Sequence, residues 1–312
     1  MIGRGELTDA AWEALKPLLP AADRSGRPWR DHRQVVNGVL WRLRTGAPWR
    51  GLPERYGPWR TAYERFARWE ADGTWAKLLE HVQVRDDAVG RVEWTVAIDS
   101  TINRVHQHAA GARKRAADRD DLEDPDSSQA CQALGRSRGG LTTKVHLAVD
   151  GRGLPLSIVL TPGNTNDATA FGQVLDGIRV PRATTGRPRT TPARVLGDKA
   201  YSNRAIRHLP RRRGIAATIP ERRDQVANRR RRGTLGGRPP AFDKDIYRVR
   251  NTVERCFARL EQFRAIATRF DKLADRYRAG IVLATLILWL REPARDQLSD
   301  RPRPSGWTAN GA

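Results

Sequence analysis

The chain has 312 residues, 39% hydrophobic and 29% charged, a composition that supports a folded protein with a sizeable core and excludes a wholly disordered chain. Its 57 lysines and arginines outnumber its 35 acidic residues, giving a formal net charge of +22, and this excess favours a polyanionic partner, nucleic acid before anionic membrane. The two cysteines, Cys131 and Cys256, are far apart in the chain, which excludes a disulfide framework and a cysteine-ligated zinc site.

Residues 1–88 are expected to form a small all-helical domain, and its first residues lack the apolar segment of a signal peptide. Thr8 and Asp31 are typical N-cap residues before apolar residues at helical spacing, and Gly46 is expected to end the second helix. Two more short helices are expected within 57–82. Such helices permit a helix-turn-helix-like DNA-binding domain; a plain helical bundle explains the pattern as well, and the arginines between 42 and 68 favour DNA.

Residues 89–291 are expected to form a second domain, in which β-rich segments come first. Strands are expected within 91–101, in a hairpin at 141–161 that turns at Asp150 and Gly151, and within 193–201 and 214–220. The charged segment 109–138, between the first two strands, is expected to be a mobile loop.

Arginines dominate the segment 221–245, which glycines and prolines interrupt and which is expected to be a loop. It is either a solvated connector or an arm that contacts phosphates and orders on binding. Helices are expected at 244–264 and 273–291, followed by a disordered tail at 292–312. The longest apolar run, 279–290, is too short to span a bilayer, so we expect a buried helix, no membrane partner and a cytoplasmic protein associated with the nucleoid.

Two of the expected strands end in an aspartate. Asp99 follows the apolar residues 96–98, and Asp198 follows Val195, Leu196 and Gly197. If these strands are neighbours, their corresponding ends bring the two carboxylates together, where they repel each other unless a proton or a divalent cation binds. Oxygen ligands without histidine or cysteine favour Mg²⁺ or Mn²⁺ over zinc.

Glu254 is a third acid, at the edge of the buried face of the helix expected at 244–264. It shares a helical stripe with Tyr247, Arg250 and Glu261, beside the apolar stripe that faces the core. Glu254 could therefore lean over the strand ends as a third ligand. An ordinary ion pair with Arg250, worth about 0.3 kcal/mol, explains the same spacing and is the simpler interpretation of these residues alone.

Several motifs occur together in one order along the chain. They are AIDSTINRVHQH at 97–108, the hairpin segment at 135–167, LGDKAY at 196–201 and YRVRNTVERCFARLEQFR at 247–264. With the helical segment at 7–75, they resemble the DDE transposases of bacterial insertion sequences, specifically the insertion sequence five group and its insertion sequence four relatives. The resemblance covers nearly the whole chain.

The resemblance implies an α/β, RNase H-like catalytic domain, with a mixed sheet flanked by helices, after the helical N-terminal domain. It implies that Asp99, Asp198 and Glu254 are the catalytic acids and hold one or two Mg²⁺ or Mn²⁺ ions. Arg250 and Tyr247 are expected to position the DNA phosphate, and Lys199 and Tyr201 are further DNA-contact candidates, although Tyr201 in the core and Lys199 in solvent are the plain alternatives. The family usually has a basic residue at the position of Glu261, and Arg264, one turn on, is the candidate substitute.

The resemblance further implies an enzyme that binds double-stranded DNA at the terminal inverted repeats of an insertion sequence. It would cleave a strand with water and then join the freed 3′-hydroxyl to target DNA, with a dimer assembled on the DNA. A catalytically weak or inactive DNA-binding protein derived from a transposase is the alternative, and a metal-dependent nuclease shares the first step. A tyrosine recombinase is disfavoured because no Arg-His-Arg set accompanies Tyr201 or Tyr247.

Overall fold

The structure is a computed structural model that describes residues 5–20, 29–111 and 132–291. Most of the loop expected at 109–138, and the whole tail expected at 292–312, lie outside the described residues.

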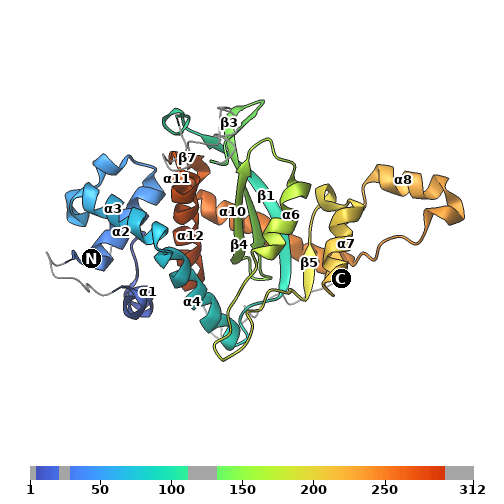
Figure 1. The fold of residues 1–312 in the computed structure, drawn as a ribbon, viewed down its shortest axis with the longest axis horizontal. Coiled ribbons are helices and arrows are strands. Elements are labelled where there is room, and N and C mark those ends of the chain that lie inside the picture. The colour runs from blue at the N-terminus through green and yellow to red at the C-terminus, as the bar shows by residue number, and fades with distance from the viewer. Residues whose placement is uncertain (1–4, 21–28, 112–131, 292–312) are drawn as a thin grey trace, which may run out of the picture.

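Four α-helices form the N-terminal part of the chain (Figure 1). They are α1 (Asp9–Leu15), α2 (His32–Thr45), α3 (Trp59–Ala71) and α4 (Thr74–Ala88). The expected caps are confirmed: Thr8 accepts a hydrogen bond from the N–H of Ala11, and Asp31 accepts two from the first turn of α2. Gly46 ends α2 in the left-handed conformation, with φ 70°.

Seven strands form one mixed sheet. They are β1 (Thr95–Val105), β2 (Gly135–Ser137), β3 (Gly140–Val149), β4 (Pro155–Pro162), β5 (Arg194–Leu196), β6 (Ala216–Thr218) and β7 (Thr268–Arg269). The central strand, β1, pairs antiparallel with β3 and parallel with β5 and β7. The hairpin expected at 141–161 is confirmed as β3 and β4, and β5 and β6 are the expected later strands.

Strand β1 is longer than the sequence predicts. Asp99 does not end it, because β1 continues to Val105 and stays paired with β3 as far as Arg104. Strand β5 is short, pairs only with residues 95–97 of β1, and ends at Leu196. One edge of β1 therefore has no strand partner in the described structure between the ends of β5 and β7, and Asp99 lies in this interval.

Helices flank the sheet and complete the fold (Figure 1). They are α6 (Asp167–Asp176), α7 (Arg204–Arg212), α8 (Arg223–Arg231), α9 (Lys244–Tyr247), α10 (Asn251–Glu261), α11 (Arg264–Ala267) and α12 (Ala274–Arg291). Helix α12 packs beside α4 and against β4, and residues 279–289 are buried, as the sequence predicts. None of the described helices is long and apolar enough to cross a membrane.

Two expected elements differ in detail. The expected helix at 244–264 consists of α9, a 3-10 turn at Arg248–Arg250, α10 and the start of α11. The basic loop expected at 221–245 contains α8, a 3-10 turn at Gly233–Gly236 and the start of α9. Arginine, glutamine and alanine are good helix formers, and in α8 this preference outweighs the repulsion among its charges.

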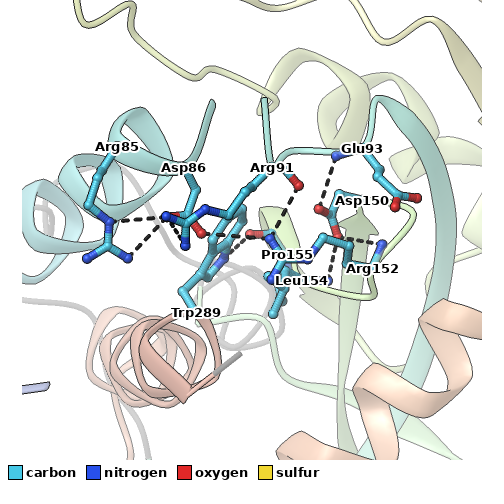
Figure 2. Close-up of polar contacts among 9 residues, drawn as sticks. All are labelled: Arg85, Asp86, Arg91, Glu93, Asp150, Arg152, Leu154, Pro155 and Trp289. Carbon is cyan, nitrogen blue, oxygen red and sulfur yellow. Dashed lines mark hydrogen bonds and ion pairs between the residues drawn. The ribbon is translucent and has the colours of Figure 1, made fainter. Parts of the chain in front are cut away.

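Buried acids hold the base of the sheet against α4, and Trp289 of α12 donates to the carbonyl oxygen of Pro155 at 3.1 Å beside them (Figure 2). Asp150 at the hairpin turn accepts hydrogen bonds from the N–H groups of Arg152 at 3.0 Å and Leu154 at 2.8 Å. Asp86 on α4 is 1% exposed and lies within 3.8 Å of the guanidinium groups of Arg91 and Arg152. One continuous hydrophobic core joins the N-terminal helices to the sheet, so α4 and α12 fix the position of the sheet relative to α1–α3. The division of the chain into domains at residue 88 stays a prediction.

Candidate active site

The parallel register of β1 and β5 brings Asp99 and Asp198 into corresponding positions. Ala97 pairs with Leu196, and each aspartate lies two residues further along its own chain segment. Asp198 is the N-cap of a 3-10 turn, Lys199–Tyr201, and its carboxylate accepts the N–H of Ala200 at 2.7 Å. The strand pattern therefore predicts the neighbourhood of the two acids correctly, although Asp99 lies within its strand.

Arg250 connects Asp99 to Glu254. Its guanidinium forms an ion pair with Asp99 and donates through Nη1 to Glu254 Oε1 at 2.7 Å. The side chains of Asp99 and Arg250 are 19% and 17% exposed, whereas Glu254 is 54% exposed. The structure thus contains the ion pair that the sequence offered as the simple explanation of Glu254, and the same arginine also brings Glu254 beside β1.

The electrostatics of Asp99 reflect this crowding. Burial raises the pKa of Asp99 to about 6; the backbone N–H of Ser100 and the Arg250 guanidinium oppose the increase, and the charges of Asp198 and Glu254 add to it. The charges of Asp198 and Glu254 therefore both reach Asp99, and a bound cation would relieve this repulsion.

The donor chemistry of the three acids fits Mg²⁺ or Mn²⁺, because all the ligands would be carboxylate oxygens. In the described part of the chain, no three histidine, cysteine, aspartate or glutamate side chains already lie close enough to hold one ion. The Arg250 guanidinium instead lies between Asp99 and Glu254. An ion that binds both carboxylates would therefore compete with this guanidinium.

The other predicted DNA-contact residues differ in their surroundings. Tyr247 is half-buried, its ring lies 5.1 Å from that of Phe242, and burial raises its pKa, with smaller effects from the charges of Arg250 and the acids. Lys199 is exposed beside Asp198. Tyr201 is 1% exposed and packs on Phe171 at 5.5 Å, so its prediction as a DNA contact is wrong and its alternative role in the core is correct.

Glu261 and Arg264 lie in different surroundings. Thr101 Oγ1 donates to Glu261 Oε1 at 3.4 Å, which places Glu261 two residues along β1 from Asp99. Arg264 begins α11, is exposed, and has its Cβ next to Gly46 at the end of α2. It therefore lies at the junction with the N-terminal helices, and its role as a DNA contact in place of Glu261 stays a prediction.

A buried polar network behind Asp99 was missed from the sequence. Asp167 Oδ1 accepts hydrogen bonds from Ser100 Oγ at 2.7 Å and from Lys144 Nζ at 2.9 Å. Burial alone would raise the pKa of Asp167, but these two donors lower it. Lys144 and His146, at alternate positions of the buried strand β3, were the signal for this network, because both point to the side of the sheet that α6 covers.

The mixed sheet carries one acid on its central strand, a second acid follows the parallel neighbouring strand, and a flanking helix carries a third. This arrangement defines an RNase H-like catalytic domain. The comparisons with known families agree. The profile described as "Transposase DDE domain" matches residues 90–290, and the chain belongs to this family. A second profile, described as "Putative transposase of IS4/5 family", matches residues 7–79.

Similar curated proteins come from several bacteria. A protein of Burkholderia cepacia named "Putative transposase for insertion sequence element IS402" is 32% identical over 49% of this chain and 65% of its own length. "Putative transposase for insertion sequence element IS6501" of Brucella ovis is 28% identical over 48% of this chain and 100% of its own. An uncharacterized protein, y4sN of Sinorhizobium fredii, is 38% identical over 35% of this chain and 83% of its own. No solved structure matches this chain significantly.

Proposed function

We propose that this chain is the DNA transposase of an insertion sequence. It binds the terminal inverted repeats of the element and carries out Mg²⁺-dependent strand cleavage and strand transfer, with Asp99, Asp198 and Glu254 as the catalytic acids. The observation that supports the proposal is the arrangement at the unpaired edge of β1, where Arg250 joins Asp99 to Glu254 and Asp198 follows the neighbouring strand, in a chain of net charge +22. The protein acts on DNA in the bacterial nucleoid, as a dimer that holds two element ends.

Each residue of the site has a role in this chemistry. Asp99, Asp198 and Glu254 would hold one or two Mg²⁺ ions, which supply charge neutralisation at the reacting phosphate and a more acidic nucleophile. The planar guanidinium of Arg250 suits a phosphate as well as a carboxylate, so it balances the acids before DNA arrives and orients the phosphate afterwards. In each step an incoming oxygen, first from water and then from the freed 3′-hydroxyl, replaces the leaving oxygen at phosphorus by in-line attack. No covalent bond between protein and DNA forms.

The test is incubation of the purified chain with the DNA ends that flank its gene, a target plasmid and Mg²⁺. We expect nicked ends and products joined to the plasmid, both abolished on addition of EDTA. Asp99→Asn, Asp198→Asn and Glu254→Gln should each abolish cleavage while retaining DNA binding. Full cleavage by one of these variants removes that residue from the site, and end binding without any nicking would support the alternative of a DNA-binding protein derived from a transposase.

A further inference from the structure

A basic arm, residues 221–240, projects from the body of the protein, with α8 along its length (Figure 1). It contains seven arginines (222, 223, 229, 230, 231, 232 and 238) and two acids, Glu221 and Asp224. Every residue from 220 to 251, a range that the structure describes throughout, is partly or fully exposed. The arm therefore has no core of its own.

The base of the arm is attached to the segment that carries Asp198. Gln225 Nε2 donates to the carbonyl oxygen of Ser202 at 3.1 Å, and Arg222 Nε donates to Ser202 Oγ at 3.3 Å. Ser202 is buried and immediately follows the 3-10 turn that Asp198 caps. An ion pair between Arg229 and Glu221 braces α8 against the same base. These contacts anchor the base of the arm next to the segment that carries Asp198.

The tip of the arm presents a leucine to solvent. Leu235 is 89% exposed, more than any other large hydrophobic residue in the described chain. The turn that carries Leu235 has a defined backbone conformation. Gly233 and Gly237 have φ of 54° and 71°, and the N–H of Leu235 donates to the carbonyl of Arg232 at 3.1 Å. Gly236 packs so closely on α8 that an added Cβ would lie 2.2 Å from the Arg229 carbonyl oxygen. Leu235 is therefore held out by a defined turn.

Two physical features of the arm favour DNA as its binding partner. A nine-residue helix without a packed face is marginal in water, and four consecutive arginines at its end repel one another. Arg223, Arg230 and Arg232 have no acidic partner among the described residues, so their charges are available to phosphates. Proteins that bind the minor groove insert apolar side chains such as leucine between base steps while arginines hold the backbone.

We propose that the basic arm lies along the DNA backbone through the arginines of α8 and inserts Leu235 between base pairs, unstacking the duplex at a fixed offset from the cleavage site. This inference rests on the proposed function, because it needs DNA in the active site. It adds a DNA-distorting side chain to the three acids and to the phosphate-positioning residues.

The experiment uses the full chain and short duplexes that tile the DNA flanking its gene, probed with permanganate, which oxidises unstacked thymines. The wild-type protein should produce reactive thymines at one offset from the nick. Leu235→Ser should abolish that reactivity and Leu235→Phe should keep it, because a ring also separates base pairs. Val89→Ser, which changes another exposed apolar residue (59%) at the C-terminal end of α4, should behave as wild type. Replacing Arg230, Arg231 and Arg232 by Gln should make the salt dependence of binding shallower by about 0.9 in log–log slope for each phosphate that the variant no longer neutralises.

Unchanged thymine reactivity in Leu235→Ser, or an unchanged salt slope in the arginine variant, overturns the proposal. So does a change in the molecular mass of the DNA-free protein caused by Leu235→Ser, because the tip would then be an interface between protein chains. A wild-type protein that nicks the flanking DNA without reactive thymines refutes the wedge and leaves the proposed function intact. A wild-type protein that neither binds nor nicks any of these duplexes refutes both.

Discussion

Arg250 forms an ion pair with Asp99, although 151 residues separate them in the chain, and it donates to Glu254 at 2.7 Å through its other terminal nitrogen. One guanidinium thus occupies the space where two of the three acids would share a cation. Arg250 offsets part of the negative charge of the three acids, and in the proposed mechanism it would exchange a carboxylate for a phosphate. This residue therefore links the protein without DNA to the proposed chemistry.

Replacement of Arg250 by Gln should lower Mg²⁺-dependent strand cleavage by about 100-fold or more, because the reacting phosphate then has no charged donor at this position. Arg250→Lys should recover only part of the rate, since one ammonium group cannot span two oxygen partners as a guanidinium does. Single-turnover cleavage measures the effect, and Arg213→Gln, which removes an ion pair with Asp176 at the C-terminal end of α7, is the control. Cleavage by Arg250→Gln at the rate of that control would show that the ion pair has only a structural role.

Glu261 puts a negative charge next to the face of β1 that would receive DNA. Glu261→Lys should increase DNA affinity and steepen its salt dependence by about 0.9 in log–log slope, the effect of neutralising one more phosphate. The hydrogen bond that this substitution removes, from Thr101 at 3.4 Å, is weak, so the melting temperature should change little. Binding isotherms at several salt concentrations provide the measurement, and an unchanged slope would mean that position 261 does not contact the backbone.

The short apolar runs before Asp99 and Asp198 predict that each aspartate follows a buried stretch of strand, but only the strand before Asp198 ends there. The continuation of β1 past Asp99 depends on pairing with β3, a long-range contact that no local pattern reports. Tyr201 illustrates the same limit. Its place after Asp198 suggests a side chain that can reach DNA, but its packing against Phe171 of α6 buries it. The network of Lys144 with Asp167 also depends on a contact between distant segments.

A buried ion pair joins the N-terminal helices to the sheet. Both terminal nitrogens of Arg42 on α2 donate to the Asp271 carboxylate at 3.1 Å, and the two side chains are 4% and 11% exposed. Asp271→Asn leaves a buried arginine without a counter-charge and should lower the free energy of unfolding by about 3–5 kcal/mol. Chemical denaturation tests this expectation. Glu64→Gln, which breaks the exposed pair with Arg60, should cost at most about 1 kcal/mol, and equal decreases in both variants would contradict the argument.

His146 should make the protein sensitive to acid. It is 1% exposed on β3, Nε2 lies 2.8 Å from Thr161 Oγ1, and it faces Lys144 and Asp167. Burial lowers its pKa from 6.5 to about 4; the charge of Asp167 opposes this decrease and that of Lys144 adds to it. Below pH 6.5 the unfolded chain therefore binds more protons than the folded one, so stability falls as the pH decreases from about 6.5 to 4, by on the order of 3 kcal/mol.

Denaturation across this range should show a shallower acid dependence in His146→Gln than in wild type, whereas His81→Gln, at an exposed position of α4, should keep the wild-type slope. Parallel pH profiles for wild type and His146→Gln would show that His146 does not cause this acid sensitivity and that other buried groups do.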